Sequence, residues 1–78
     1  MTQDDAQTSL AAWLRDNGHT IEDAALAAWT AIDAGQGAWI FTPPGGMNAQ
    51  FVVMPTGVRM VRPSEEALGD VLAELGLT

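Results

Sequence analysis

The stretch from Gly37 to Arg62 contains no acidic residue, and it is the part of the chain that has the pattern of a β-sheet. It holds three short segments rich in β-branched and aromatic residues, at about 38–42, 50–54 and 58–62. Prolines and glycines separate these segments, so each is expected to form one strand. Because strands with short connections tend to be neighbours, we predict a three-stranded antiparallel meander.

Side chains alternate between the two faces of a sheet, so each residue of this stretch can be assigned to a face. One face is predicted to carry Trp39, Phe41, Phe51 and Val53, and the opposite face Ile40, Val52 and Met60. Both faces are apolar, and helices or a partner are expected to cover them. Arg59 and Arg62 favour an edge position for the third strand, since charged side chains discourage edge-to-edge aggregation.

Helical patterns lie on both sides of the predicted sheet. Apolar residues recur every three or four positions at about 3–17, 20–34 and 64–76, which predicts a helix in each range. Thr2 followed by Asp5 resembles a capping box at the start of the first helix, and Thr20 followed by Asp23 repeats this pattern at the start of the second. The 78 residues are therefore expected to form one α+β domain with the element order α-α-β-β-β-α.

Each predicted helix has an apolar stripe expected to be buried against the sheet. In the second helix the stripe is Ile21, Ala25, Ala28, Trp29 and Ile32, and in the third it is Leu68, Val71, Leu72 and Leu75. Gly69 interrupts the third helix, which indicates a close approach of another backbone.

All the acidic residues of the chain lie outside the predicted sheet. The net charge is −7, from ten acidic residues and three arginines, without any lysine. Two helices joined at Gly18 resemble a helix-turn-helix, but the second helix offers Glu22, Asp23 and Asp33 and no cation. Phosphate would repel such a helix, so direct binding to nucleic acid is disfavoured and a basic protein or nucleoprotein complex is the expected partner.

Composition limits the function in other ways. The chain contains no cysteine, which excludes disulfides and thiolate metal sites, and its single histidine, His19, has no partner at ligand spacing. We find no catalytic or cofactor motif, and therefore expect no enzymatic activity, no cofactor and no metal. No signal-peptide or membrane-span pattern is present, so we expect a cytoplasmic protein. A core this small also favours self-association, for example as a homodimer.

Three carboxylates of the third helix form the first candidate binding site. Glu66, Asp70 and Glu74 are spaced four residues apart, which places them along one helix face. Neighbours in such a row lie about 6 Å apart, a spacing comparable with that of phosphates along a nucleic acid strand. The row is read either as a nucleic acid mimic that grips a basic surface or as an ordinary solvated helix face.

The second candidate is Leu26, which falls among Glu22, Thr30 and Asp33 on the polar side of the second helix. An apolar residue within an acidic patch can anchor a partner. The alternative is that the buried stripe of this helix is simply broad.

These patterns lead to the expectation of a non-enzymatic, acidic protein-interaction module. Its most concrete form is an inhibitor or decoy that occupies a basic, nucleic-acid-binding surface. Phage-encoded inhibitors of host nucleases and CRISPR complexes are proteins of this general kind. The alternative is an immunity protein, antitoxin or assembly subunit that binds one cognate protein through apolar contacts, at a sheet edge or an apolar patch.

Overall fold

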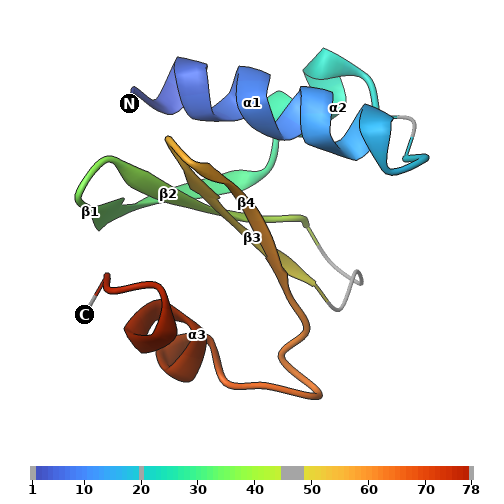
Figure 1. Cartoon of the computed structure of the whole chain (residues 1–78). Coiled ribbons are helices and arrows are strands. Elements are labelled where there is room, and N and C mark those ends of the chain that lie inside the picture. The colour runs from blue at the N-terminus through green and yellow to red at the C-terminus, as the bar shows by residue number, and fades with distance from the viewer. Residues whose placement is uncertain (1, 20, 45–48, 78) are drawn as a thin grey trace.

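The computed structural model describes residues 2–19, 21–44 and 49–77. Its elements are α1 (Gln3–Asp16), α2 (Asp23–Ala27), β1 (Thr30–Gly35), β2 (Ala38–Thr42), β3 (Gln50–Met54), β4 (Gly57–Val61) and α3 (Leu68–Glu74). The strands pair antiparallel in the order β1-β2-β3-β4. Figure 1 shows α1 and α2 on one face of this sheet and α3 on the other. The α+β class and the meander are confirmed, but the sheet has four strands where three were predicted.

The additional strand replaces the second half of the predicted helix 20–34. That helix is wrong beyond Ala27, since Ala28 is its C-cap and β1 begins at Thr30. In β1, Ala31 pairs with Phe41 and Ile32 pairs with Ile40. Pairing with β2 outweighs the helix propensity of the alanines, because propensity is a weak determinant compared with tertiary pairing. The expected capping of this helix by Thr20 lies outside the described residues, and Glu22 is the N-cap.

A tight turn with positive φ angles joins β1 to β2. Gly35, Gln36 and Gly37 have φ values of 83°, 54° and 79°. The pairing register shifts between Asp33 and Gly35, which marks a β-bulge just before the turn. Asp33 Oδ1 accepts a hydrogen bond of 2.8 Å from the Gly35 N–H, so the carboxylate satisfies a backbone donor at this irregularity.

The third helix is also shorter than predicted. It was expected at 64–76, but α3 begins at Leu68, with Ala67 in an extended conformation (ψ 136°) as its N-cap. Ahead of it, the N–H groups of Glu65 and Glu66 donate to the Arg62 carbonyl and form a separate turn. The extended Ala67 therefore separates this turn from the helix. Gly69 has open space at the position of a Cβ atom, so it does not mark a close backbone approach.

The sheet separates two apolar clusters. The larger one lies under α1 and α2 and is formed by Ala6, Leu10, Leu14, Leu26, Trp29, Phe41, Ala49, Phe51 and Val53. Two tryptophans pack on Phe51, with centroid distances of 5.8 Å for Trp13 and 5.7 Å for Trp29. The smaller cluster is formed by Ile40, Val52, Val61 and Val71, with leucines of the α3 segment beside it. The C-terminal helix is thus held by one buried valine and a rim of half-buried leucines.

The register of β3 with β4 corrects the predicted face of Met60. Phe51 lies opposite Met60, and Val52 lies opposite Arg59. Residues directly opposite in an antiparallel pair share a face, so Met60 lies on the α1 side and not with Val52. Met60 packs against the larger cluster, as this register requires. The predicted edge position of this strand is confirmed, because β4 is the last strand of the sheet.

The start of α1 follows the capping expectation. Thr2 Oγ1 accepts a hydrogen bond of 3.2 Å from the Asp5 N–H. At the other end, Gly18 takes a φ of 82° after the C-cap Asn17. One of the orphan N–H groups at the helix start is thereby satisfied, and α1 is fixed at both ends.

Candidate functional site

Glu66 is the first of the three carboxylates expected on one helix face, and it lies before the helix. Its Oε1 forms an ion pair of 2.9 Å with Arg59 Nη2, and its Oε2 accepts a hydrogen bond of 3.5 Å from the Arg62 N–H. The Arg59 side chain is 37% exposed and that of Glu66 is 32% exposed. Arg59 Nη1 also donates to the Met60 carbonyl at 2.7 Å. Glu66 therefore ties the turn before α3 to β4, and its charge is already compensated.

A second ion pair lies beside the first. Arg62 Nη1 is 3.7 Å from Glu65 Oε2, and both side chains are mostly exposed. Two of the three arginines of the chain are thus paired with acidic residues of the same turn. The positive charge of the central stretch is consequently not free to offset the carboxylates of the helices.

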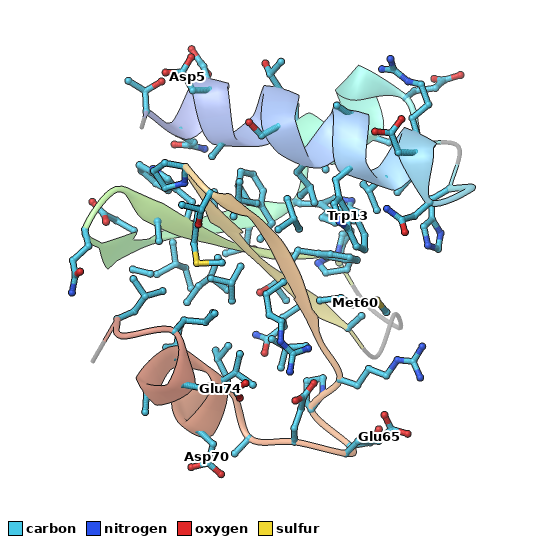
Figure 2. The ribbon with its side chains drawn as sticks, viewed as in Figure 1. Asp5, Trp13, Met60, Glu65, Asp70 and Glu74 are labelled. Carbon is cyan, nitrogen blue, oxygen red and sulfur yellow. The ribbon has the colours of Figure 1, made fainter. Side chains whose placement is uncertain are left out.

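Asp70 and Glu74 remain from the predicted row. Both are exposed, and they are four residues apart in α3, which places them on one helix face. Figure 2 shows them on the far side of the sheet from α1, with Glu65 at the end of the preceding turn. The last turn of α3 contains no basic residue. This face is therefore negative along the short helix, but it has two carboxylates where three were predicted.

Glu22 and Asp33 do not join this face. Glu22 is exposed at the N-terminus of α2, which lies with α1 on the opposite side of the sheet. Asp33 is exposed on β1, where it pairs with Trp39 and bonds the Gly35 N–H. The predicted site residues therefore lie on separate surfaces of the molecule.

Leu26 is buried in the core and cannot anchor a partner in this structure. Its side chain is 1% exposed, and it belongs to the larger cluster under α1. The alternative reading of a broad apolar stripe agrees with this position.

The acidic residues of α1 were not predicted as partner contacts. Asp4, Asp5 and Asp16 are all exposed, and Figure 2 shows Asp5 on the opposite side of the molecule from Asp70. The signal was present in the sequence, because these positions fall outside the buried stripe of Ala6, Leu10 and Leu14. Carboxylates therefore occur on both helical layers.

Ile32 is exposed, contrary to the prediction. It was expected in the buried stripe of the second helix, but its side chain is 52% exposed on β1. It is the one large apolar side chain that is exposed among the described residues. A glycine-containing turn between two apolar segments is a hairpin signal, and it would have placed Ile32 in a strand.

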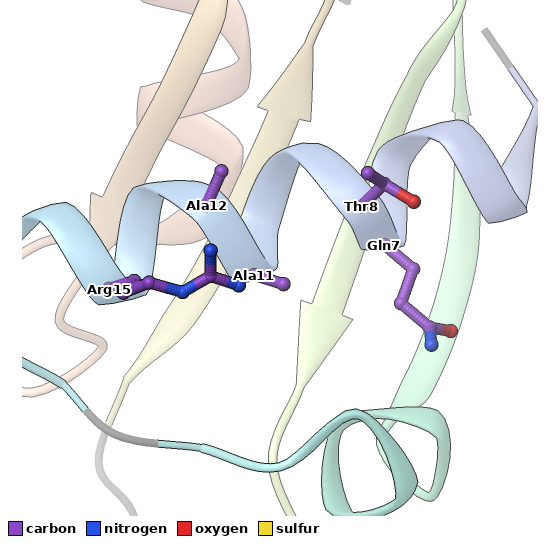
Figure 3. A pocket seen from close by; sticks show the side chains of 5 residues that line it. All are labelled: Gln7, Thr8, Ala11, Ala12 and Arg15. Atoms are coloured by element: carbon purple, nitrogen blue, oxygen red, sulfur yellow. The ribbon is translucent and has the colours of Figure 1, made fainter.

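Described residues line two grooves on the surface. The first follows α1 and is lined by Gln7, Thr8, Ala11, Ala12 and Arg15. Figure 3 shows the Arg15 side chain running along the helix toward Ala11, and no ion pair of Arg15 is found in the described part of the chain. The second groove lies between Trp13 and the β3–β4 turn. The lining of the second groove includes the hydroxyl of Ser9 and the carboxylate of Asp16, and no hydrogen bond joins these two side chains. The described residues contain no group of three potential metal ligands.

Comparisons with protein families, with curated proteins and with solved structures found no significant match to this chain. None of the helices in the described ranges is long and apolar enough to cross a membrane.

Proposed function

We propose that the protein is a non-enzymatic, acidic interaction module that binds a basic surface of a partner protein. One observation carries this proposal: the α3 carboxylates Asp70 and Glu74 are exposed and form no ion pair with the described residues, whereas two of the three arginines already form local ion pairs. A surface with a net charge of −7 attracts basic partners and accelerates their encounter.

The contact face we propose is the outer side of α3, with Asp70 and Glu74 at its centre and Glu65 beside it. A partner needs no rearrangement of the core to reach these side chains, because all three are exposed. Glu66 is excluded as a primary contact, since its half-buried side chain binds Arg59 at 2.9 Å, whereas the Glu65–Arg62 pair is longer, at 3.7 Å, and exposed. Leu26 is excluded because it is buried.

The most concrete form of this function is an inhibitor that competes with nucleic acid for the partner, like the proteins that block nucleases or CRISPR complexes. Carboxylates on one helix face present negative charge at a spacing of about 6 Å, close to that of phosphates on a strand. Arginine and lysine side chains that bind phosphate also bind carboxylate with good geometry.

The first test neutralises the α3 face. We expect the double variant Asp70→Asn, Glu74→Gln to weaken partner binding by about 1 kcal/mol, since exposed ion pairs contribute up to about 1 kcal/mol each. The partner is isolated from the native host with the tagged wild-type protein, and affinities are then measured by calorimetry at low and raised salt. The dependence of affinity on salt should become shallower in the double variant, because fewer charges take part.

The matched control is Asp4→Asn, Asp16→Asn, which removes the same charge from exposed positions on α1. It should leave the α3 contact intact and reduce affinity only through the smaller net charge. If both double variants lose the same affinity, binding responds to net charge alone and α3 is not the contact face. Unchanged affinity in the α3 variant would remove α3 from the proposal.

A second candidate function is binding of one cognate protein through apolar contacts, as in an immunity protein, an antitoxin or an assembly subunit. The exposed Ile32 on an edge strand favours this candidate. Such binding would persist at raised salt and would survive neutralisation of α3.

A further inference from the structure

The outer edge of β1 is open for pairing. β1 is the first strand in the order β1-β2-β3-β4, and among the described elements β2 is the one that contacts it along its length. The N–H and C=O groups on the other side of β1 face no described strand. Such groups are a template for pairing with a strand of another chain.

The two edges of the sheet differ in how they resist pairing. β4 carries Arg59 and is followed by Arg62 and Pro63, and charged residues and proline are the usual protection of an edge. β1 contains no proline and no basic residue, and its one charge, Asp33, already accepts a hydrogen bond from within the strand. The β-bulge between Asp33 and Gly35 protects only the end of β1 next to the turn, so β1 is the less protected edge over Thr30 to Asp33.

Ile32 gives this edge an apolar contact. It lies opposite Ile40 in β2, so it is on the α3 side of the sheet, where Ile40 belongs to the smaller core cluster. Ala34, further along β1, packs against the same cluster. A strand added at this edge would cover Ile32 and extend the apolar layer outward.

We propose that β1 pairs antiparallel with β1 of a second copy of this chain, so that the two four-stranded sheets become one. The best two-fold register centres on Ile32, which then meets its own copy, while Ala31 faces Asp33 of the other chain. A register centred on Asp33 would set two carboxylates opposite each other, which is unfavourable. A register centred on Ala31 would place Ile32 against Thr30 and lose the apolar pair.

Charge makes this dimer sensitive to salt in a predictable direction. In the register centred on Ile32, the two Asp33 carboxylates are diagonal neighbours at about 8 Å and repel each other weakly. Each chain also has a net charge of −7. Added salt screens both repulsions, so dimerisation should strengthen as salt rises. Binding of a basic partner responds in the opposite direction, so this inference stands or fails independently of the proposed function.

The expected dimer is weak and depends on concentration. Pairing of one short strand buries less than the area of about 1,600 Å² found in standard stable interfaces. Dissociation should therefore be visible within the micromolar range.

The test is sedimentation velocity on the full chain over a micromolar concentration series, at low and at raised salt. We expect wild type to pass from monomer to dimer, and Ile32→Lys to raise the dissociation constant about tenfold or more, because it removes the apolar pair and sets two cations opposite each other. Asp33→Asn keeps an oxygen for the Gly35 N–H and should tighten the dimer about threefold by removing the diagonal repulsion.

The control is Thr56→Lys, which adds the same charge at the exposed β3–β4 turn and should leave dimerisation as in wild type. Circular dichroism verifies folding, and Ile32→Thr, which keeps a β-branched residue, replaces Ile32→Lys if the latter fails to fold. A wild-type protein that stays monomeric at raised salt overturns the proposal. So does a dimer that tolerates both Ile32 substitutions, since its interface would then lie elsewhere.

Discussion

At the scale of single residues, burial separates the side chains that hold the fold from those that can meet a partner. Leu26 and Glu66 were both predicted as contacts, and each has an internal role: Leu26 lies in the core, and Glu66 bonds Arg59 and the Arg62 N–H. Asp70 and Glu74 have exposed side chains and remain candidates. Sequence spacing gave the right helix face for these two but could not reveal an arginine from β4 beside Glu66.

The residue-scale prediction concerns Leu26. We expect Leu26→Ala to lower the free energy of unfolding by about 2–4 kcal/mol, because it leaves a cavity in a packed core. The measurement is chemical denaturation followed by tryptophan fluorescence. The control is Leu68→Ala in α3, whose half-buried side chain should cost clearly less. A small loss at Leu26 combined with weaker partner binding would instead support the anchor reading.

At the scale of elements, the accuracy of the predicted helices and strands depended on how strongly each segment determines its own structure. The predicted strands and the first helix correspond to β2, β3, β4 and α1, because turn residues and clear periodicity delimit them. The prediction for residues 30–35 was wrong because Ala31 and Ala34 fit a helix as well as a strand. Only pairing with β2 decides between the two structures. The predicted start of the third helix was wrong because Ala67 is extended, and the periodicity of apolar residues does not reveal such a local conformation.

Two glycines provide the element-scale prediction. A Cβ atom would meet nothing within 4 Å at either Gly35 or Gly69, so backbone conformation alone decides the effect of alanine. Gly35 has a φ of 83°, and Gly35→Ala should destabilise the β1–β2 hairpin by about 1–2 kcal/mol. Gly69 lies in the first turn of α3, and Gly69→Ala should stabilise the protein by about 0.5 kcal/mol. Thermal unfolding of the two variants compares them, and shifts of the same sign would contradict this account.

At the scale of the whole molecule, the distribution of charge affects the stability of the fold. Acidic side chains lie on both helical layers, whereas the described sheet carries Asp33 and Arg59 as its charged residues. The net charge of −7 predicts repulsion within the folded chain, which is partly offset by the half-buried Arg59–Glu66 pair and the exposed Arg62–Glu65 pair. Because ion pairs in contact with solvent contribute little, the repulsion should dominate.

The whole-molecule prediction follows from that balance. Raising sodium chloride from low to physiological ionic strength should increase the midpoint of thermal unfolding by a few degrees, since salt screens repulsion between surface carboxylates. Calorimetry at a protein concentration low enough to keep the chain monomeric separates this effect from dimerisation. Sucrose at matched osmolarity is the control for general solute effects. A lower midpoint in salt would mean that the Arg59–Glu66 and Arg62–Glu65 pairs outweigh the repulsion.

The order β1-β2-β3-β4 also has a consequence for how the chain reaches this structure. Every strand pairs with its neighbour in sequence, so the sheet forms through connections between consecutive strands and needs no crossover. Proteins rich in such local contacts fold quickly, because little loop entropy is lost before contacts form. The slower step is then the docking of α1 on β3, which joins segments far apart in the chain. Until α1 docks, the face of the sheet that it covers is exposed to solvent. The acidic charge that opposes compaction also makes partly folded chains repel one another, which disfavours their aggregation.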